Sequence, residues 1–95
     1  MAKQPCVYIL TNKLHTVVYT GMTTNLRQRM EQHRAKAVPG FTKRYNCTKL
    51  VFVEFFTTIH EAASAEKKVK GWSRVKKDQL IKNLNPNWKD LADDL

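Results

Sequence analysis

Residues 6–10 read CVYIL and residues 16–20 read TVVYT, two apolar runs separated by the polar link TNKLH at residues 11–15. Both runs are rich in β-branched and aromatic side chains, which favour strands, and the link between them is short and turn-like. The pattern predicts a β-hairpin whose second strand ends at Gly21. This hairpin decides the fold, because the later segments need an apolar surface on which to pack.

From about Thr24 the apolar residues follow a helical period. Leu26, Met30 and His33 recur at i, i+4 and i+7, which places them on one face of a helix. A threonine, Thr23 or Thr24, can cap its first turn. We expect the helix to end before the Pro-Gly turn that follows.

The second half of the chain predicts one more strand and one long helix. Residues 41–48 are polar and basic and are expected to form a loop, whereas residues 49–56, KLVFVEFF, have the strongest strand pattern in the chain. Thr58 followed by Glu61 fits a capping box, and the apolar stripe behind it predicts a helix of roughly 20 residues ending near residue 83.

Asn85 and Pro86 interrupt that pattern and can open a short last helix over residues 87–91. The predicted order is therefore β-β-α-β-α with a C-terminal appendage. This is an α+β fold in which helices flank a three-stranded antiparallel sheet. The length fits a single domain over residues 1–95.

The net charge is the unusual feature of the composition. The chain has 17 Lys and Arg against 8 Asp and Glu, a formal charge of +9. Such a charge destabilises a compact chain by self-repulsion, which indicates a polyanionic partner.

Most of the basic side chains fall into two groups, one around the first helix and the following loop and one on the predicted long helix. Clustered basic side chains invite phosphate contacts, and the aromatic side chains among them, Phe41, Tyr45 and Trp72, can stack on bases. For Trp72 a place in the core is the favoured interpretation, because it lies on the apolar stripe. The candidate nucleic-acid contacts are Arg27, Lys43, Arg44, Lys67, Lys70, Arg74 and Lys77.

The cysteines and the N-terminus indicate a compartment. Two cysteines, Cys6 and Cys47, cannot build a disulfide framework, and no Cys/His cluster has zinc-ligand spacing. Residues 1–5 carry no apolar signal-peptide core, and no run approaches the length of a membrane span. We expect a reduced cytoplasmic protein without a membrane partner.

Several polar side chains are expected beside the thin core. Tyr8 and Tyr19 lie on the two hairpin strands, Arg29 and His33 border the apolar face of the first helix, and Glu66 lies beside the stripe of the long helix. Buried polar groups cost free energy unless they are paired, so a functional site explains this set better than packing does.

The same residues carry a resemblance to a known family. Val7-Tyr8 followed by Tyr19-Thr20-Gly21 resembles the two halves of the GIY-YIG nuclease signature, with Cys6 in place of its first glycine and Val7 in place of its isoleucine. Residues 19–33 continue as the family's Y-x-G-x-[TA]-x-[DN]-L-x-x-R-x-x-x-H. The stretches around Glu66 and over residues 85–88 resemble the small stand-alone bacterial branch, which is similar to the nuclease domain of the excision-repair endonuclease.

The resemblance implies a divalent-metal-dependent DNA endonuclease with a role in DNA repair or recombination. Tyr8 and Tyr19 match the signature tyrosines, Arg29 the arginine and Glu66 the metal-binding glutamate, while His33 matches a frequent histidine. Glu66 is then expected to hold Mg²⁺ or Mn²⁺, and Arg29 to bind phosphate oxygens. Tyr8 is expected to be the general base, with its pKa lowered by Arg29 and the metal, and Tyr19 to orient the water.

Two further points stay open on the sequence. The family's late asparagine can be Asn83 or Asn85, and Asn85 is preferred because it opens the Asn-Pro-x-Trp match. The alternative function is a nucleic-acid-binding accessory module with little or no turnover. In either case specificity is expected to come from DNA structure or from a protein partner.

Overall fold

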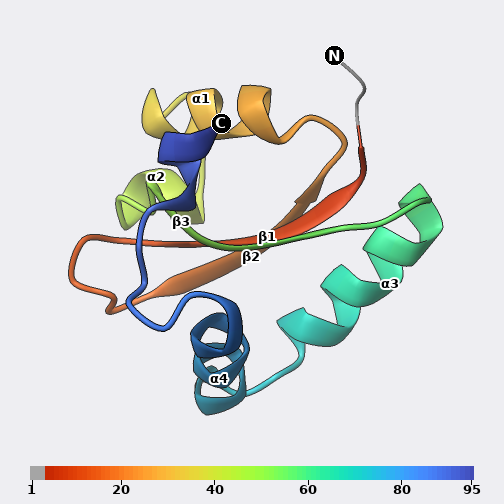
Figure 1. The fold of residues 1–95 in the computed structure, drawn as a ribbon. Helices are drawn as coiled ribbons and strands as arrows, with labels where there is room; N and C mark the ends of the chain where they lie inside the picture. Colours follow the sequence, from red (N-terminus) through yellow and green to blue (C-terminus); the bar gives the residue numbers. More distant parts are fainter. Residues whose placement is uncertain (1–3) are drawn as a thin grey trace.

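The computed structural model describes residues 4–95, and its sheet confirms the predicted α+β class. Strands β1 (Cys6–Thr11), β2 (Val18–Thr23) and β3 (Lys49–Phe55) form an antiparallel sheet in the order β2-β1-β3, so β1 is central (Figure 1). Residues 1–3, on which the signal-peptide prediction partly falls, lie outside the described range.

The hairpin forms as predicted, but its second strand lies further along the chain. Strand β2 begins at Val18 and continues through Gly21 to Thr23, because the pairing with β1 extends to Thr23 opposite Cys6. The Asn12 side chain accepts hydrogen bonds from the N–H groups of Thr16 and Val17, and this fixes the link between the strands.

Alternate side chains of β1 enter two separate cores. Tyr8 and Leu10 pack with α1 (Leu26–Arg34) and η1 (Leu91–Asp94), on what we call the tyrosine face of the sheet. Ile9 packs on the opposite face with α3 (Ile59–Lys70) and α4 (Arg74–Leu84), which we call the α3 face. Figure 1 shows the two pairs of elements on either side of the sheet.

The predicted long helix is wrong, because the structure has two helices in its place. Gly71 ends α3, and the Ser73 side chain accepts a hydrogen bond from the Lys76 N–H and so begins α4. The apolar stripe runs across the break because both helices pack on the α3 face, so the period alone could not reveal it. The predicted capping box of Thr58 and Glu61 is confirmed.

Two other boundaries differ from the prediction. The loop expected over residues 41–48 contains a short helix, α2 (Phe41–Arg44), whose Thr42 is buried. The cap of α1 is Asn25 and not Thr23 or Thr24, because the Asn25 side chain accepts from the Gln28 N–H.

The expected short C-terminal helix is present, but over other residues than 87–91. Asn85 closes α4 instead of opening a helix, and the final 3-10 turn, η1, is capped by Asp90. The Asp90 carboxylate accepts from the N–H of Leu50 at 3.1 Å and from Arg34 at 2.7 Å. These contacts hold the C-terminal segment over the tyrosine face.

Candidate active site

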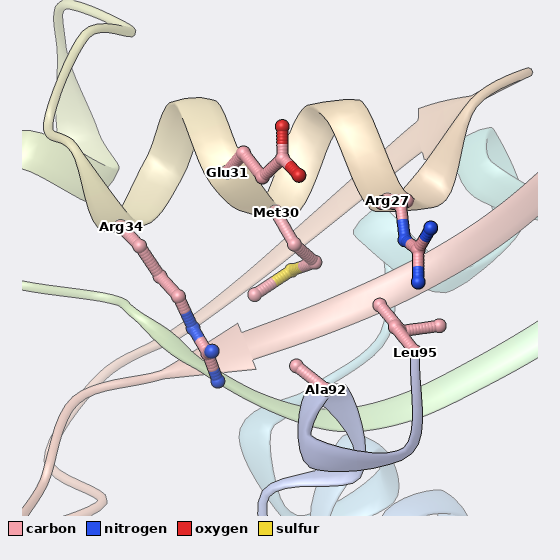
Figure 2. Close-up of a pocket in the computed structure, with 6 residues that line it drawn as sticks. All are labelled: Arg27, Met30, Glu31, Arg34, Ala92 and Leu95. Atoms are coloured by element: carbon pink, nitrogen blue, oxygen red, sulfur yellow. The ribbon is translucent and has the colours of Figure 1, made fainter.

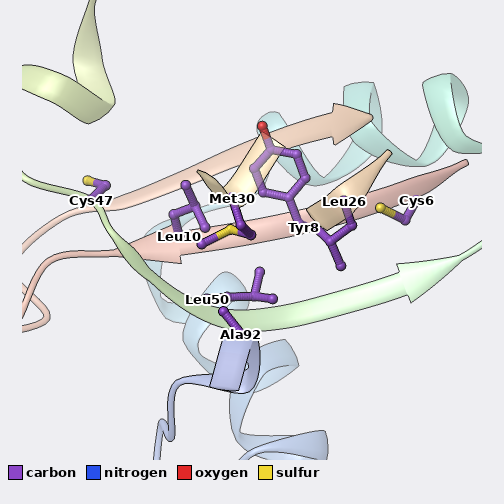
Figure 3. Packing of buried hydrophobic residues seen from close by; sticks show 8 residues of the cluster. All are labelled: Cys6, Tyr8, Leu10, Leu26, Met30, Cys47, Leu50 and Ala92. Atoms are coloured by element: carbon purple, nitrogen blue, oxygen red, sulfur yellow. The ribbon is translucent and has the colours of Figure 1, made fainter. Parts of the chain in front are cut away.

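Tyr8 is completely buried in the tyrosine-face core. Figure 3 shows its ring between Leu26 and Leu10, with the hydroxyl directed out of the apolar cluster. A buried phenol needs a hydrogen-bond partner, and the tip of this ring is where polar groups meet it.

Gly21 allows the Tyr8 ring to lie on the backbone of β2. The two residues are paired across the hairpin, and a β-carbon on Gly21 would stand 2.5 Å from both Cζ and the hydroxyl oxygen of Tyr8. No side chain fits at that distance, so the glycine sets the position of the phenol.

His33 links the Tyr8 phenol to α2. Its Nε2 lies 3.1 Å from the Tyr8 hydroxyl, and its Nδ1 lies 2.9 Å from Oγ1 of Thr42. When the neutral ring carries its proton on Nδ1 and donates it to Thr42, Nε2 accepts the proton of the Tyr8 hydroxyl. This chain joins one strand and two helices around one ionisable phenol.

Tyr19 lies over the same cluster and is half-buried. Its ring centroid is 6.4 Å from that of Tyr8 and 6.0 Å from that of His33. Phe41 stacks on the other side of Tyr19, also at 6.0 Å. Tyr19 therefore separates the buried Tyr8–His33 pair from an exposed aromatic surface.

The electrostatics of the cluster differ from the expectation for Tyr8. Burial raises the pKa of the Tyr8 phenol, and the neighbouring Tyr19 adds to this effect, while the Arg29 guanidinium opposes it without reversing it. The net lowering expected from Arg29 is therefore not found, because burial outweighs the guanidinium. Burial, and to a lesser degree Arg29, lower the pKa of His33, so its imidazole is neutral near pH 7 and can accept a proton.

Glu66 is not part of this contact network. It lies half-buried on α3, and among residues 4–95 its ionic partner is Lys70, with Oε2 and Nζ 3.3 Å apart. Helix α3 packs on β1 and β2 from the α3 face, whereas the tyrosines lie on the other face. The structure brings Tyr8, Tyr19, Arg29 and His33 together and leaves Glu66 across the sheet.

The residues present fit a metal ion that needs few protein ligands. Within residues 4–95 no group of three His, Cys, Asp or Glu side chains could hold an ion. Mg²⁺ often binds through one carboxylate and keeps its waters, so Glu66 alone suits it better than it suits zinc. The Lys70 amine is half exposed, and such i,i+4 ion pairs are weak enough for a divalent cation to displace.

Asn85 has a structural role in this fold. Its amide nitrogen donates to the carbonyls of Val51, at 3.0 Å, and Lys89, at 2.8 Å, while its oxygen accepts from the Lys89 N–H. These bonds use both amide protons and attach the residue to β3, at the opposite edge of the sheet from Tyr19. The contacts give no support to a catalytic role for Asn85.

The candidate phosphate contacts differ in how free their side chains are. Arg27, Lys43, Arg44 and Lys67 are exposed, Lys77 is half-buried, and Lys70 pairs with Glu66. Arg74 has a structural role, because it pairs with Asp78 at 2.7 Å and donates to the carbonyls of His15 and Thr16. Arg27 lines a hollow of about 140 Å³ that neither Tyr8 nor Tyr19 lines. Figure 2 shows its side chain between α1 and the C-terminal segment.

The sequence did not reveal three positions that build the cluster. The pattern places Thr42 in a loop and Gly21 at the end of a strand, and it indicates Phe41 as a ring that can stack on bases and not as a neighbour of Tyr19. The GIY-YIG resemblance itself pointed to Gly21, but the close approach of the Tyr8 ring became visible only in the structure. No local pattern marks Thr42 as the partner of His33.

Comparison with known proteins agrees with this arrangement. Residues 4–79 match the family model described as the GIY-YIG catalytic domain. The chain belongs to the GIY-YIG family. This is a nuclease family, and GIY-YIG nucleases are generally dependent on divalent metal ions.

Its relatives are small stand-alone proteins. A UPF0213 protein of Natronomonas pharaonis is 35% identical over 81 residues, which cover 85% of this chain and 94% of that protein. A UPF0213 protein of Clostridium perfringens is 40% identical over 75 residues, covering 79% and 80% of the two chains. The solution structure of a UPF0213 protein from Bacillus halodurans matches with a TM-score of 0.59 and 31% identity over 92% of each chain. These names state no activity.

A helix needs a certain length and apolarity to span a membrane. None of the helices in residues 4–95 is both long and apolar enough to span a bilayer.

Proposed function

We propose that this GIY-YIG protein is a divalent-metal-dependent DNA endonuclease acting in DNA repair or recombination. The observation that carries the proposal is the convergence of Tyr8, Tyr19, Arg29 and His33, in the family's order, at one place beside the sheet. Hydrolysis of a phosphodiester needs a deprotonated water, neutralised phosphate charge and a stabilised leaving oxygen.

The Tyr8–His33 pair is suited to proton transfer. Because burial raises the pKa of Tyr8, a free phenolate is disfavoured in the metal-free protein. A relay avoids that charge: Tyr8 takes the proton of the water as its own proton passes to Nε2 of His33, 3.1 Å away. The neutral state of His33 is what allows it to receive this proton.

Tyr19 and Arg29 meet the phosphate. Tyr8 is fully buried in the free protein, so the water must enter as the DNA binds, and half-exposed Tyr19 is the tyrosine that it meets first. Arg29 can donate two parallel hydrogen bonds to the phosphate oxygens and neutralise the charge that develops there.

Glu66 would hold the metal ion, which when bound stabilises negative charge on the leaving oxygen. Strand β2 is an edge strand, so a DNA strand that passes its free edge can reach both the tyrosine face and α3. Thr20 of β2 has a buried oxygen, Oγ1, on the side of the sheet that α3 covers. This oxygen has no hydrogen-bond partner among the described residues and adds a polar atom to that region.

The test is cleavage by purified wild type and Glu66→Gln on single-stranded, duplex, flapped and branched DNA, with Mg²⁺, Mn²⁺ or chelator. Glu66→Gln should abolish cleavage and leave DNA binding intact or slightly tighter, because it removes one negative charge. Glu54→Gln, which removes the same charge from an exposed position on β3, is the matched control and should cleave normally. Normal cleavage by Glu66→Gln would show that Glu66 holds no essential metal.

An accessory role without turnover gives a different result. It predicts DNA binding by the wild type but no metal-dependent cleavage on any of the four substrates. Binding itself should be electrostatic in both cases, with log affinity falling against log salt at a slope of about −4 to −5 for four to six phosphate contacts on duplex DNA. A flat salt response would exclude nucleic acid as the partner.

A further inference from the structure

Three aromatic rings form a continuous surface next to the Tyr8–His33 pair. Phe41 and Tyr45 are 42% and 39% exposed, and their ring centroids lie 4.7 Å apart. Phe41 also stacks on Tyr19, with the ring centroids 6.0 Å apart. We call Phe41 and Tyr45 the ring pair. Large exposed aromatic side chains cost free energy in water, so two together beside a candidate active site call for a ligand.

The ring pair is held rigidly by the same residue that orients His33. Phe41 and Tyr45 are four residues apart, at the start and the C-cap of α2, and so lie on one side of this turn. Thr42, between them, is buried and holds His33 at 2.9 Å, while its carbonyl accepts from the N–H of buried Cys47. A platform fixed in this way loses little conformational entropy when a flat ligand stacks on it.

The segment of chain that carries the ring pair is basic. Residues 32–53 contain no Asp or Glu and contribute Lys36, Lys43, Arg44 and Lys49, besides Arg34, which pairs with Asp90. The Arg44 guanidinium lies 5.5 Å from the Tyr45 ring centroid, over its face. An apolar protein partner does not need this charge, whereas a polyanion with flat rings needs both the charge and the aromatic faces.

We propose that the ring pair is a stacking subsite for an unpaired base of the nucleic acid whose phosphate enters the neighbouring tyrosine site. The proposal rests on the proposed function for its ligand class and deepens it by naming the substrate form. In a duplex the faces of each base are covered by its neighbours, so only an unpaired base can offer a face to Phe41 or Tyr45. The subsite therefore selects a single strand, a flap or a gap over an intact duplex.

The test separates base stacking from phosphate attraction. Two probes are compared by fluorescence anisotropy in chelator: oligothymidylate, whose bases stack poorly on one another, and an abasic oligomer of the same length and phosphate count. The variant is Phe41→Leu/Tyr45→Leu, which keeps apolar volume and every charge but removes both aromatic faces. The control is Phe55→Leu, which removes an equally exposed ring, 48% accessible, from β3.

Wild type and Phe55→Leu should bind oligothymidylate about fivefold to a hundredfold more tightly than the abasic oligomer. The double variant should lose most of this preference, bind the abasic oligomer as wild type does, and keep the wild-type salt slope. Equal losses on both probes, or no loss on either, would overturn the proposal. No loss is also the result expected if the ring pair covers a protein partner or a second copy of this chain.

The design keeps the two proposals distinguishable. Binding in chelator does not require cleavage, so the base preference can hold in a protein that never cuts DNA. Cleavage with no base preference would support the endonuclease and overturn the stacking subsite. If the double variant melts at a lower temperature, the single variant Tyr45→Leu replaces it, because it leaves the stacked Tyr19–Phe41 pair in place.

Discussion

The hydroxyl of Tyr8 and Nε2 of His33 lie 3.1 Å apart, although 25 residues separate them in the chain. Tyr8 belongs to the central strand and His33 to α1, so this hydrogen bond connects the sheet to the helix that covers it. Both groups are buried, and the contact between them forms only when α1 packs on the sheet. The state of the imidazole therefore decides whether the phenol has a proton acceptor.

His33 should titrate below its ordinary pKa of about 6.5. Burial disfavours the imidazolium, and Arg29 adds a like charge. The measurement is an NMR titration of the ring protons, in which Arg29→Gln should raise the pKa of His33 and the exposed Arg27→Gln should leave it unchanged.

The same shift fixes the sign of a stability effect. Between the lowered folded pKa and the unfolded pKa, the unfolded chain binds more protons, so the free energy of unfolding rises with pH. The free energy of unfolding should thus fall as the pH drops below about 6.5. Over the same fall in pH the His33 ring becomes protonated. A His33 pKa above its ordinary value would show that the ring is charged at neutral pH and cannot serve as the acceptor.

Gly21→Ala should displace the Tyr8 ring. The added methyl would stand 2.5 Å from the tip of the phenol, so the buried ring must move or the strands must separate. We expect a loss of about 1–3 kcal/mol of stability from overpacking, together with a cleavage rate reduced at least tenfold. Gly71→Ala is the control, because its nearest contact would be an ordinary 3.5 Å. A cleavage rate equal to that of wild type would show that the phenol position does not matter.

Periodicity and caps predicted much of the fold. The apolar, β-prone run at residues 6–10 predicted β1, and the spacing of Leu26, Met30 and His33 gave the buried face of α1, because both patterns are local. The break between α3 and α4 was missed because both helices pack on the same face. The local features that separate them are the C-cap at Gly71 and the N-cap at Ser73.

The candidate site was predictable as a set of residues but not as a geometry. The order of Tyr8, Tyr19, Arg29 and His33 identified the cluster, because the family resemblance carries residue identity. It could not give the long-range contacts: Thr42 behind His33, Gly21 under the Tyr8 ring, and Glu66 on the other face of the sheet. Those depend on how the elements pack.

Asn85→Ala should destabilise the protein without changing its chemistry. The change leaves the carbonyls of Val51 and Lys89 without their donor in a buried setting, at a cost of about 1–3 kcal/mol. The melting temperature should fall by about 4–8 °C for each kcal/mol. The cleavage rate, measured well below that temperature, should equal that of wild type.

Asn83→Ala is the matched control for Asn85, because Asn83 is exposed on α4 and its loss should leave the melting temperature unchanged. Should the cleavage rate fall in Asn83→Ala instead, with the fold intact, Asn83 would be the asparagine that serves the site. If Asn85→Ala lost cleavage activity at a temperature where the variant is fully folded, Asn85 would have a catalytic role.

Tyr8→Phe and Tyr19→Phe distinguish the roles of the two tyrosines. Each change removes one oxygen and keeps the ring. Tyr8→Phe also leaves Nε2 of His33 without its buried partner, so the melting temperature should fall, by an amount that corresponds to about 1–3 kcal/mol. Tyr19 has no such buried partner among the described residues, and its variant should melt as wild type does.

The cleavage rates are measured in single turnover, at a temperature where both variants are folded. We expect the larger loss of rate for the buried tyrosine, Tyr8, and the smaller loss for the half-exposed Tyr19. A general base contributes about 10²–10⁴-fold, so Tyr8→Phe should lose at least about a hundredfold. Tyr19→Phe should lose about tenfold to a hundredfold, as expected for a hydrogen bond that orients the water. If Tyr19→Phe lost more, the base would be Tyr19, the tyrosine that solvent reaches, and Tyr8 would serve to position His33. Wild-type rates in both variants would leave the phosphate chemistry to Arg29 and Glu66.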